Sequence, residues 1–390
     1  MSLKSDICGK IYVGDGMNKN IDNINVADEL FDKTMDVLKE MTPVNVLVVG
    51  KTGVGKSTLI NAIFRENLAT TGIGKPVTKS VTRITKENIP IVLYDTKGLE
   101  LQKNESEIIA EVREFLKNKE SENDPIHVAY FVVSAQSARI EDAEINLINE
   151  LAKFMPVILV LSKYFGDEAR ELDKYMHSLD LNVADIIPVL AKEMRLSSSL
   201  VIKPQGLKEL VQKTVSLIPE ETKNSFINAQ HADIDLKVKR ARSWAKKYIA
   251  TTFGVGFVPI PFSDASVLVP MQVAMLAHIT AIFGLSLDKT RLTSIVAAVG
   301  GTGGATFLGR YIVSNVLKLI PGAGTILGGL ISGSTASILT TALAFSYIET
   351  LAIMTKNEKE GKSMSVFELE ELMKKLYKEH LSNKNDETKK

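Results

Sequence analysis

One eight-residue stretch constrains this chain more than any other feature: GKTGVGKS at residues 50–57, between a short apolar run at 44–49 and a helical pattern from about Lys56. It fits the pattern G-x-x-x-x-G-K-S at every fixed position. Glycines admit backbone angles that let successive N–H groups turn inward around phosphate oxygens, and the following helix directs its positive end at them. The stretch therefore predicts a strand, a loop and a helix that hold the phosphates of a nucleotide.

The chemistry of the loop assigns a role to each end of it. The Lys56 ammonium is expected on the β- and γ-phosphates, and the Ser57 hydroxyl is expected to ligate Mg²⁺. A glycine-rich turn that happens to contain Lys-Ser is the alternative, and the flanking strand and helix argue against it. The predicted phosphate-binding residues are Gly50, Thr52, Gly53, Val54, Gly55, Lys56, Ser57 and Thr58.

The rest of the chain divides into three parts by its hydrophobic pattern. Residues 1–42 are a lead-in followed by a helix from about Val26 to Met41, and residues 219–390 have an all-helical pattern. Between them, at 43–218, short β-branched runs alternate with amphipathic segments, which predicts an α/β domain with a mostly parallel sheet covered by helices on both faces. The expected strands are 44–49, 91–94, 128–133, 157–161 and 186–190.

A second motif narrows the class of nucleotide-binding domain. Asp95-Thr96-Lys97-Gly98 follows the run at 91–94, at a typical distance after the loop, and together they resemble the Ras-like and Era-like (TRAFAC class) P-loop GTPases. The resemblance implies that Asp95 holds Mg²⁺ through water and that the Gly98 N–H senses the γ-phosphate. It also implies a switch threonine at 74–82, for which Thr78 fits best and Thr82 is the fallback. The implied catalytic residues are Lys56, Thr78 and Gly98, and the implied metal ligands are Ser57, Thr78 and Asp95.

The base-reading elements of that family are matched only in part. The run at 157–161 leads into Ser162 and Lys163, but Phe165 stands where the family has the aspartate that reads guanine, and Asp167 comes two residues later. Ala191 and Lys192 follow the last run, where the family has a Ser-Ala step. The resemblance implies GTP and GDP as ligands, held here by Ser162, Lys163, Asp167, Ala191 and Lys192. ATP stays an alternative because unpaired guanine donors weaken binding.

Hydrolysis is expected to be slow without help. Leu99 follows Gly98, where Ras-like enzymes often have a glutamine that orients the attacking water, and a leucine cannot do that. Glu100 could substitute, although an exposed loop glutamate is the simpler interpretation. A potassium-assisted mechanism is disfavoured because Gly53 stands at the position of the asparagine that such enzymes carry.

Charge and cysteine content limit the partners and the compartment. The net charge of +1 and the lack of interleaved basic and aromatic residues predict no nucleic-acid partner. One cysteine, Cys8, fits a reducing compartment, and the N-terminal residues show no secretory signal. A cytoplasmic protein is expected.

The C-terminal half is hydrophobic, with two alternative explanations. Between Leu292 and Thr355 the charged residues are Arg310, Lys318 and Glu349. Within it, Leu319 to Ile348 has no charge and is long enough to span a bilayer, and Leu292 to Leu308 is borderline. Glycines at four-residue spacing suit helix contacts in lipid, but many serines and threonines disfavour insertion. A soluble helical bundle explains the same composition. The basic face of a predicted helix around 237–247 is either solvated or in contact with anionic lipid.

A further resemblance concerns this half. The run VPIPFSDA at 258–265 resembles a hydrophobic domain joined to Era-like GTPases in bacteria, and the order of domains is similar to that of immunity-related and dynamin-like GTPases. Together, the two motifs and this resemblance favour a nucleotide switch. Its helical domain is expected to mediate assembly into a homodimer or higher oligomer, or contact with lipid at the inner face of a membrane. The rival hypotheses are an ATP-dependent enzyme and a membrane scaffold or channel-like protein regulated by nucleotide.

Overall fold

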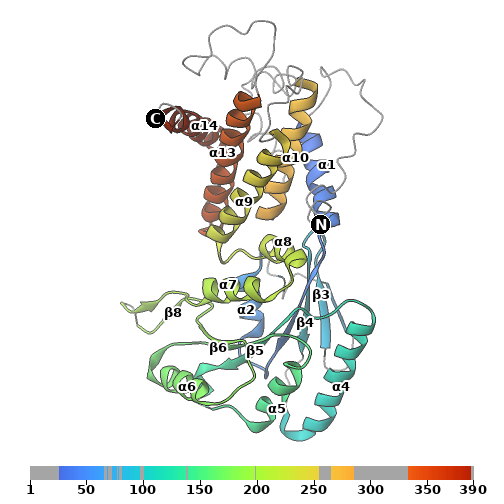
Figure 1. The fold of residues 1–390 in the computed structure, drawn as a ribbon. Coiled ribbons are helices and arrows are strands. Elements are labelled where there is room, and N and C mark those ends of the chain that lie inside the picture. Colours follow the sequence, from blue (N-terminus) through green and yellow to red (C-terminus); the bar gives the residue numbers. More distant parts are fainter. Residues whose placement is uncertain are drawn as a thin grey trace, which may run out of the picture.

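An α/β domain and a helical domain make up the computed structural model, which describes residues 26–65, 68, 73–76, 78, 81–96, 101–137, 139–197, 199–253, 265–284 and 333–387 (Figure 1). The α/β domain is built on a seven-stranded sheet in the order β2-β3-β4-β1-β5-β6-β7. Its strands are β1 (Val44–Val49), β2 (Ile73–Pro76), β3 (Val81–Thr85), β4 (Ile91–Thr96), β5 (Val128–Ser134), β6 (Val157–Ser162) and β7 (Asp185–Val189).

The predicted parallel sheet is confirmed for the five strands β4, β1, β5, β6 and β7. The edge strands β2 and β3 pair antiparallel and were not predicted, because both are short and carry polar residues between their apolar ones. A separate small hairpin, β8 (Met194–Arg195) with β9 (Val201–Ile202), extends the chain after β7 and was also not predicted.

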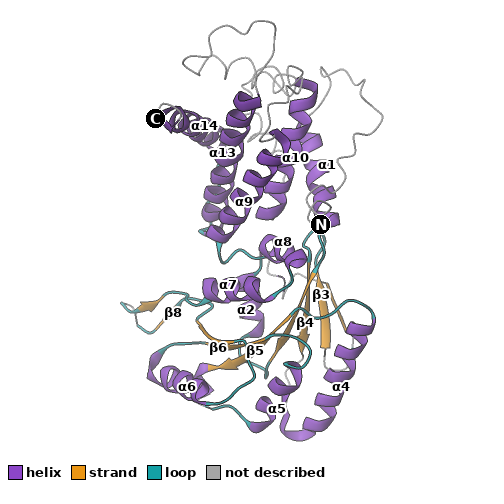
Figure 2. Cartoon of the chain, viewed as in Figure 1, coloured by secondary structure: helices purple, strands orange, loops and turns teal. Residues whose placement is uncertain are grey.

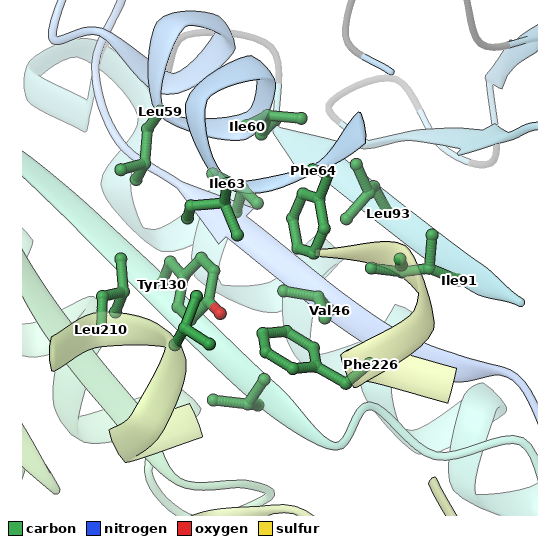
Figure 3. Packing of buried hydrophobic residues seen from close by; sticks show 14 of the residues in the cluster. Val46, Leu59, Ile60, Ile63, Phe64, Ile91, Leu93, Tyr130, Leu210 and Phe226 are labelled. Atoms are coloured by element: carbon green, nitrogen blue, oxygen red, sulfur yellow. The ribbon is translucent and has the colours of Figure 1, made fainter. Parts of the chain in front are cut away.

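Helices cover both faces of the sheet, as the sequence predicts. On one face lie α2 (Lys56–Ile63), α7 (Leu207–Leu217) and α8 (Glu220–Ala229), and on the other lie α4 (Leu101–Ser121), α5 (Asp142–Leu151) and α6 (Gly166–Ser178). Figure 3 shows the first face, where Phe64 at the end of α2 and Phe226 of α8 meet over Val46 of β1. The two rings pack edge to face with their centroids 5.7 Å apart.

Within the described residues, the core of the helical domain is formed by Ile227 of α8 together with five helices, which Figure 2 draws above the sheet. They are α1 (Val26–Glu40), α9 (Ile234–Phe253), α10 (Ala265–Phe283), α13 (Gly333–Lys359) and α14 (Val366–Glu387). The predicted first helix is confirmed, and α1 packs against α10 with Leu30 fully buried. Segments before and after the α/β domain therefore share one core. The sequence Ser365-Val366-Phe367-Glu368 has the pattern of a capping box, and the structure confirms it: Ser365 and Glu368 exchange hydrogen bonds between side chain and backbone N–H.

One described helical segment, Ser337–Lys359, is long and apolar enough to cross a membrane on length and composition alone. Of its most apolar 18-residue window, 67% is buried inside the protein. A core helix of a soluble bundle passes the same test, so the segment is weak support for a membrane span. The uncharged stretch before Gly333 and the run at 258–264 lie outside the described residues.

The prediction for Lys237 is wrong: the sequence places it on the basic face of its helix, either solvated or in contact with anionic lipid, but its side chain is buried where α8 and α10 end. Gly284 makes this meeting of helix ends possible. It follows α10 with a positive φ of 64°, and a Cβ atom there would lie 2.2 Å from the Asn228 carbonyl oxygen. Only glycine combines that backbone angle with so close an approach.

We predict that Gly284→Ala destabilises the helical domain by more than about 2 kcal/mol, because the left-handed angle and the backbone clash add together. Gly361→Ala is the matched control: Gly361 has a φ of 73°, but a Cβ atom added there would meet nothing within 4 Å. It should cost only about 1 kcal/mol, which is the strain of the backbone angle alone. Urea unfolding followed by circular dichroism measures both, and equal losses would contradict the close approach at Gly284.

Candidate nucleotide-binding site

Five parallel strands bring the predicted site residues to one edge of the sheet. The loop at 50–55 follows β1, Asp95 lies near the end of β4, and Ser162 and Lys163 lie at the end of β6. Because β4, β1, β5 and β6 are neighbours and run parallel, their carboxyl ends meet at this edge. The structure thus brings together residues that lie more than a hundred positions apart.

The loop after β1 has the backbone that its glycines predict. Gly50, Gly53 and Gly55 have φ angles of 151°, 80° and 104°. A Cβ atom at Gly50 would lie 2.4 Å from the Val132 carbonyl oxygen of the neighbouring strand β5, so this position also needs glycine for space. The loop opens directly into α2, whose first residue is Lys56.

Protein side chains bind the carbonyl groups of the loop. Lys56 Nζ donates to the carbonyl oxygens of Gly50 and Lys51, at 2.7 and 3.1 Å. Lys163 Nζ donates to Gly53 at 2.8 Å, and Ser162 Oγ lies 2.5 Å from the Val54 carbonyl oxygen. Within the described part of the chain, the N–H groups of residues 52–55 have no protein acceptor. A loop whose carbonyls are bound and whose N–H groups remain is built to receive an anion.

Asp95 fits the role of a magnesium-holding carboxylate. Its Oδ1 atom is buried and, among the described residues, lacks a hydrogen-bond partner, although buried polar atoms are rarely left unpaired. Burial raises the pKa of Asp95, and the nearby Lys56 ammonium opposes that rise. Burial likewise lowers the pKa of Lys56, against the attraction of Asp95. Ser57 lies one residue beyond Lys56 with an exposed side chain, so a hydroxyl and an orphaned carboxylate oxygen are both offered to Mg²⁺.

The predicted switch threonine, Thr78, is among the described residues, but the segment around it is described only in part. Thr78 lies between β2 and β3, where its hydroxyl accepts a hydrogen bond from the Val81 N–H at 3.0 Å. The fallback, Thr82, lies in β3 directly opposite Asp95 of β4. Gly98, Leu99 and Glu100 lie outside the described residues.

The loop after β6 is tied to the phosphate loop but presents no carboxylate at the family position. Lys163 has a left-handed φ of 54°, and its stem reaches across to Gly53. Phe165 is the N-cap residue of α6. Asp167 lies in the first turn of α6, where it is 89% exposed and accepts a hydrogen bond from Arg170 at 2.6 Å. Ala191, half-buried, and Lys192, exposed, follow β7 at the same edge.

Two contributors to this edge were not predicted. The Gln136 side-chain amide donates to the carbonyl oxygens of Lys163 and Phe165, at 3.1 and 2.9 Å, and so fixes the loop after β6. Lys51 pairs with Glu141 and Glu144 at 2.9 and 3.2 Å, which anchors the phosphate loop to the start of α5. The position of Gln136 just after β5 was a usable signal, since loops after neighbouring parallel strands converge.

Comparison with known proteins agrees with this geometry. The family described as 50S ribosome-binding GTPase matches residues 45–163. GTPase Era from Caldanaerobacter subterraneus subsp. tengcongensis is 33% identical over 181 residues, which are 45% of this chain and 55% of that protein. GTPase Der from Buchnera aphidicola is 28% identical over 204 residues, 50% of this chain and 40% of that protein. The chain thus spans about half the length of the curated relatives it matches.

A solved structure of Era in complex with MgGDPNP and 16S ribosomal RNA nucleotides is 24% identical, with a TM-score of 0.32 over 46% of this chain and 58% of that one. A score that low adds nothing to the assignment. The motif, the sheet and the sequence relatives suffice: the α/β domain is an Era-like P-loop GTPase domain. The family match ends at residue 163, so the helical domain lies outside it.

We predict that Asp95→Asn separates metal binding from folding. Since burial raises the pKa of Asp95, its ionised form weakens the fold at any pH above the ordinary aspartate range, and a neutral amide removes that cost. Melting without Mg²⁺ should therefore occur at the same or a higher temperature, while Mg²⁺-dependent nucleotide affinity falls about 10- to 100-fold. Differential scanning fluorimetry without Mg²⁺ measures the melting temperature. The same measurement over a range of nucleotide concentrations, with and without Mg²⁺, measures the Mg²⁺-dependent nucleotide affinity. Unchanged Mg²⁺ dependence would remove Asp95 from the site.

Proposed function

We propose that the whole chain is a guanine-nucleotide switch, which binds GTP with Mg²⁺, hydrolyses it to GDP, and passes the change to its helical domain. The observation that carries this proposal is the phosphate loop itself, whose carbonyls are bound by Lys56, Ser162 and Lys163 while its N–H groups remain for an anion. The relatives named GTPase Era and GTPase Der support guanine over adenine.

The chain's own residues account for binding. The loop N–H groups hold the phosphates, and the Lys56 ammonium, which has a third proton besides the two given to Gly50 and Lys51, adds its charge. Ser57 and Asp95 would hold Mg²⁺, which neutralises phosphate charge when bound. Lys163 lies between the loop after β6 and Gly53, where its aliphatic stem can cover one face of a base.

Turnover is proposed to be slow in the isolated chain and faster with a partner. Leu99 offers no group to orient water, so the missing group would come from a switch residue, a backbone group or a second copy of the chain. Self-association and reversible contact with anionic lipid at the inner face of a membrane are the two proposed outputs of the helical domain. The exposed Val366 and Phe367, at the start of α14, support a contact surface rather than a buried span.

No nucleic-acid partner is proposed. The Era structure named above contains ribosomal RNA, but this chain covers 58% of that protein, and its net charge of +1 gives no general attraction to phosphate backbones. A cytoplasmic location is proposed on the single cysteine, Cys8.

The test of the switch is calorimetric titration with GTP, GDP and ATP in the presence of Mg²⁺. Guanine nucleotides should bind more tightly than ATP, and Lys56→Ala should weaken GTP binding about 10- to 100-fold, because a charge-assisted hydrogen bond is worth about 1.5–3 kcal/mol. A preference for ATP would overturn the guanine assignment and leave the phosphate site intact. Full affinity in the Lys56 variant would mean that the site lies elsewhere.

A second prediction concerns base selection. Phe165→Asp places a carboxylate at the family position, in an extended N-cap residue that suits aspartate. It should widen the preference for GTP over ATP by about tenfold or more, since guanine donors then find an acceptor. Asp167→Ala in the parent chain is the companion variant. If Asp167→Ala loses the preference for GTP, Asp167 must break its hydrogen bond with Arg170 and bind the base. If neither variant changes the preference, base selection comes from backbone groups.

A further inference from the structure

The buried Lys237 ammonium joins the ends of two helices. Its Nζ atom donates to the carbonyl oxygens of Ile227 and Asn228, at the end of α8, at 2.6 and 2.9 Å. It also donates to the Phe283 carbonyl oxygen, at the end of α10, at 2.8 Å, with Ile282 farther away at 3.5 Å. The side chain is 1% exposed, and among the described residues no carboxylate contributes to its electrostatic environment.

Helix geometry explains how a lysine can be buried there. The last carbonyls of a helix lack partners within it and carry the negative end of its dipole, so a cation is favoured at that end. Two such ends face Lys237. Burial lowers the pKa of Lys237 well below its usual value, yet three short contacts need three N–H donors, and a neutral amine has two. The three contacts therefore require Lys237 to be protonated and positively charged.

Asn228 connects this lysine to the nucleotide-binding domain. Its carbonyl oxygen accepts from Lys237, its side-chain oxygen accepts from Arg65 at 3.1 Å, and its side-chain amide donates to the Ala281 carbonyl oxygen at 2.5 Å. Arg65 lies two residues beyond α2, the helix that begins in the phosphate loop at Lys56. One asparagine thus contacts the ends of α2 and α10 and the side chain of Lys237.

A second set of contacts fastens the same end of α2. The His231 N–H donates to the Ile63 carbonyl oxygen at 2.8 Å, and Phe64 pairs with Gln230 as an isolated antiparallel bridge. Residues 230–233 connect α8 to α9, so α2 is bound directly to the segment that leads into α9 of the helical domain. A movement of α2 along its axis cannot occur without moving this segment.

We propose that the junction formed by Arg65, Asn228 and Lys237 transmits nucleotide occupancy from α2 to the packing of α9 and α10 in the helical domain. The proposal rests on nucleotide binding at the loop before α2. At about 1.5 Å per residue, the eight residues of α2 form a rigid rod of roughly 12 Å between the phosphates and the junction. Such a contiguous chain of packed and hydrogen-bonded groups is the physical requirement for coupling.

The chain contains its own reporter of the helical domain. Trp244, its one tryptophan, lies on α9 and stacks on Tyr248 and on His278 of α10, with ring centroids 5.1 and 4.5 Å apart. Its emission therefore responds to the packing of α9 against α10. Nucleotide binding is measured separately by calorimetry, so binding and coupling are read by different signals.

The experiment compares Trp244 emission of the full chain in Mg²⁺ alone, with GDP and with a non-hydrolysable GTP analogue. The parent chain should show different emission in the GDP and GTP-analogue states. Arg65→Met should keep nucleotide affinity within about twofold, since it lies outside the phosphate site, and lose about half or more of the emission difference. Lys237→Met should also lose this emission difference. If the Lys237 variant does not fold, Arg65→Met alone tests the proposal.

Lys208→Ala is the matched control. Its ammonium pairs with Asp235 at 2.8 Å between α7 and α9, but both side chains are exposed, so its removal should leave the emission difference unchanged. Tight nucleotide binding with identical Trp244 emission in both states overturns the coupling and leaves the proposed function standing. An unchanged emission difference in Arg65→Met also overturns it. A parent chain that binds no nucleotide overturns both proposals.

Discussion

The parallel pairing of β1 with β4 and β5 is the constraint on which the rest of the structure depends. The register places Val48 opposite Asp95 and Val49 opposite Phe131, which sets the loop at 50–55 beside the Asp95 carboxylate and the backbone of β5. A slip of one residue would turn every β1 side chain to the other face of the sheet. Because β1 is buried on both faces, that register is strongly specified, and the geometry of the site follows from it.

Cations in this chain repeatedly meet backbone carbonyls. Lys56 and Lys163 bind carbonyls of the phosphate loop, and Lys237 binds those at the ends of α8 and α10. In the first case the effect is to orient a loop, and in the second it is to hold two helix ends together. Backbone carbonyls are acceptors that carry no full charge, so each ammonium keeps its positive charge for its surroundings. At the proposed phosphate site that charge would serve binding, and in the helical domain it offsets two helix dipoles.

Features that depend on local sequence could be predicted, whereas features that depend on contacts between distant residues could not. The strand, loop and helix around residues 50–57, the five parallel strands, α1 and the capping box at Ser365 follow from spacing and residue type, and the structure confirms them. Lys237 could not be placed, because its partners are helix ends whose positions come from tertiary packing. The position of Gln136 just after β5 could have placed it at this edge of the sheet, but its hydrogen bonds to carbonyls 27 and 29 residues later leave no pattern in sequence. The hydrophobic half remained ambiguous because composition suits both a bundle core and a bilayer.

The packing of α1 on α10 has a consequence for synthesis of the chain. Glu40 ends α1 and Ala265 begins α10, and the whole α/β domain lies between them. Domains fold largely in the order in which they leave the ribosome, so the sheet can close while α1 still lacks the helix that covers Leu30. Contacts between segments so distant in sequence form late and slowly. The apolar face of α1 therefore stays uncovered in the nascent chain until α10 has been synthesised and has packed against it.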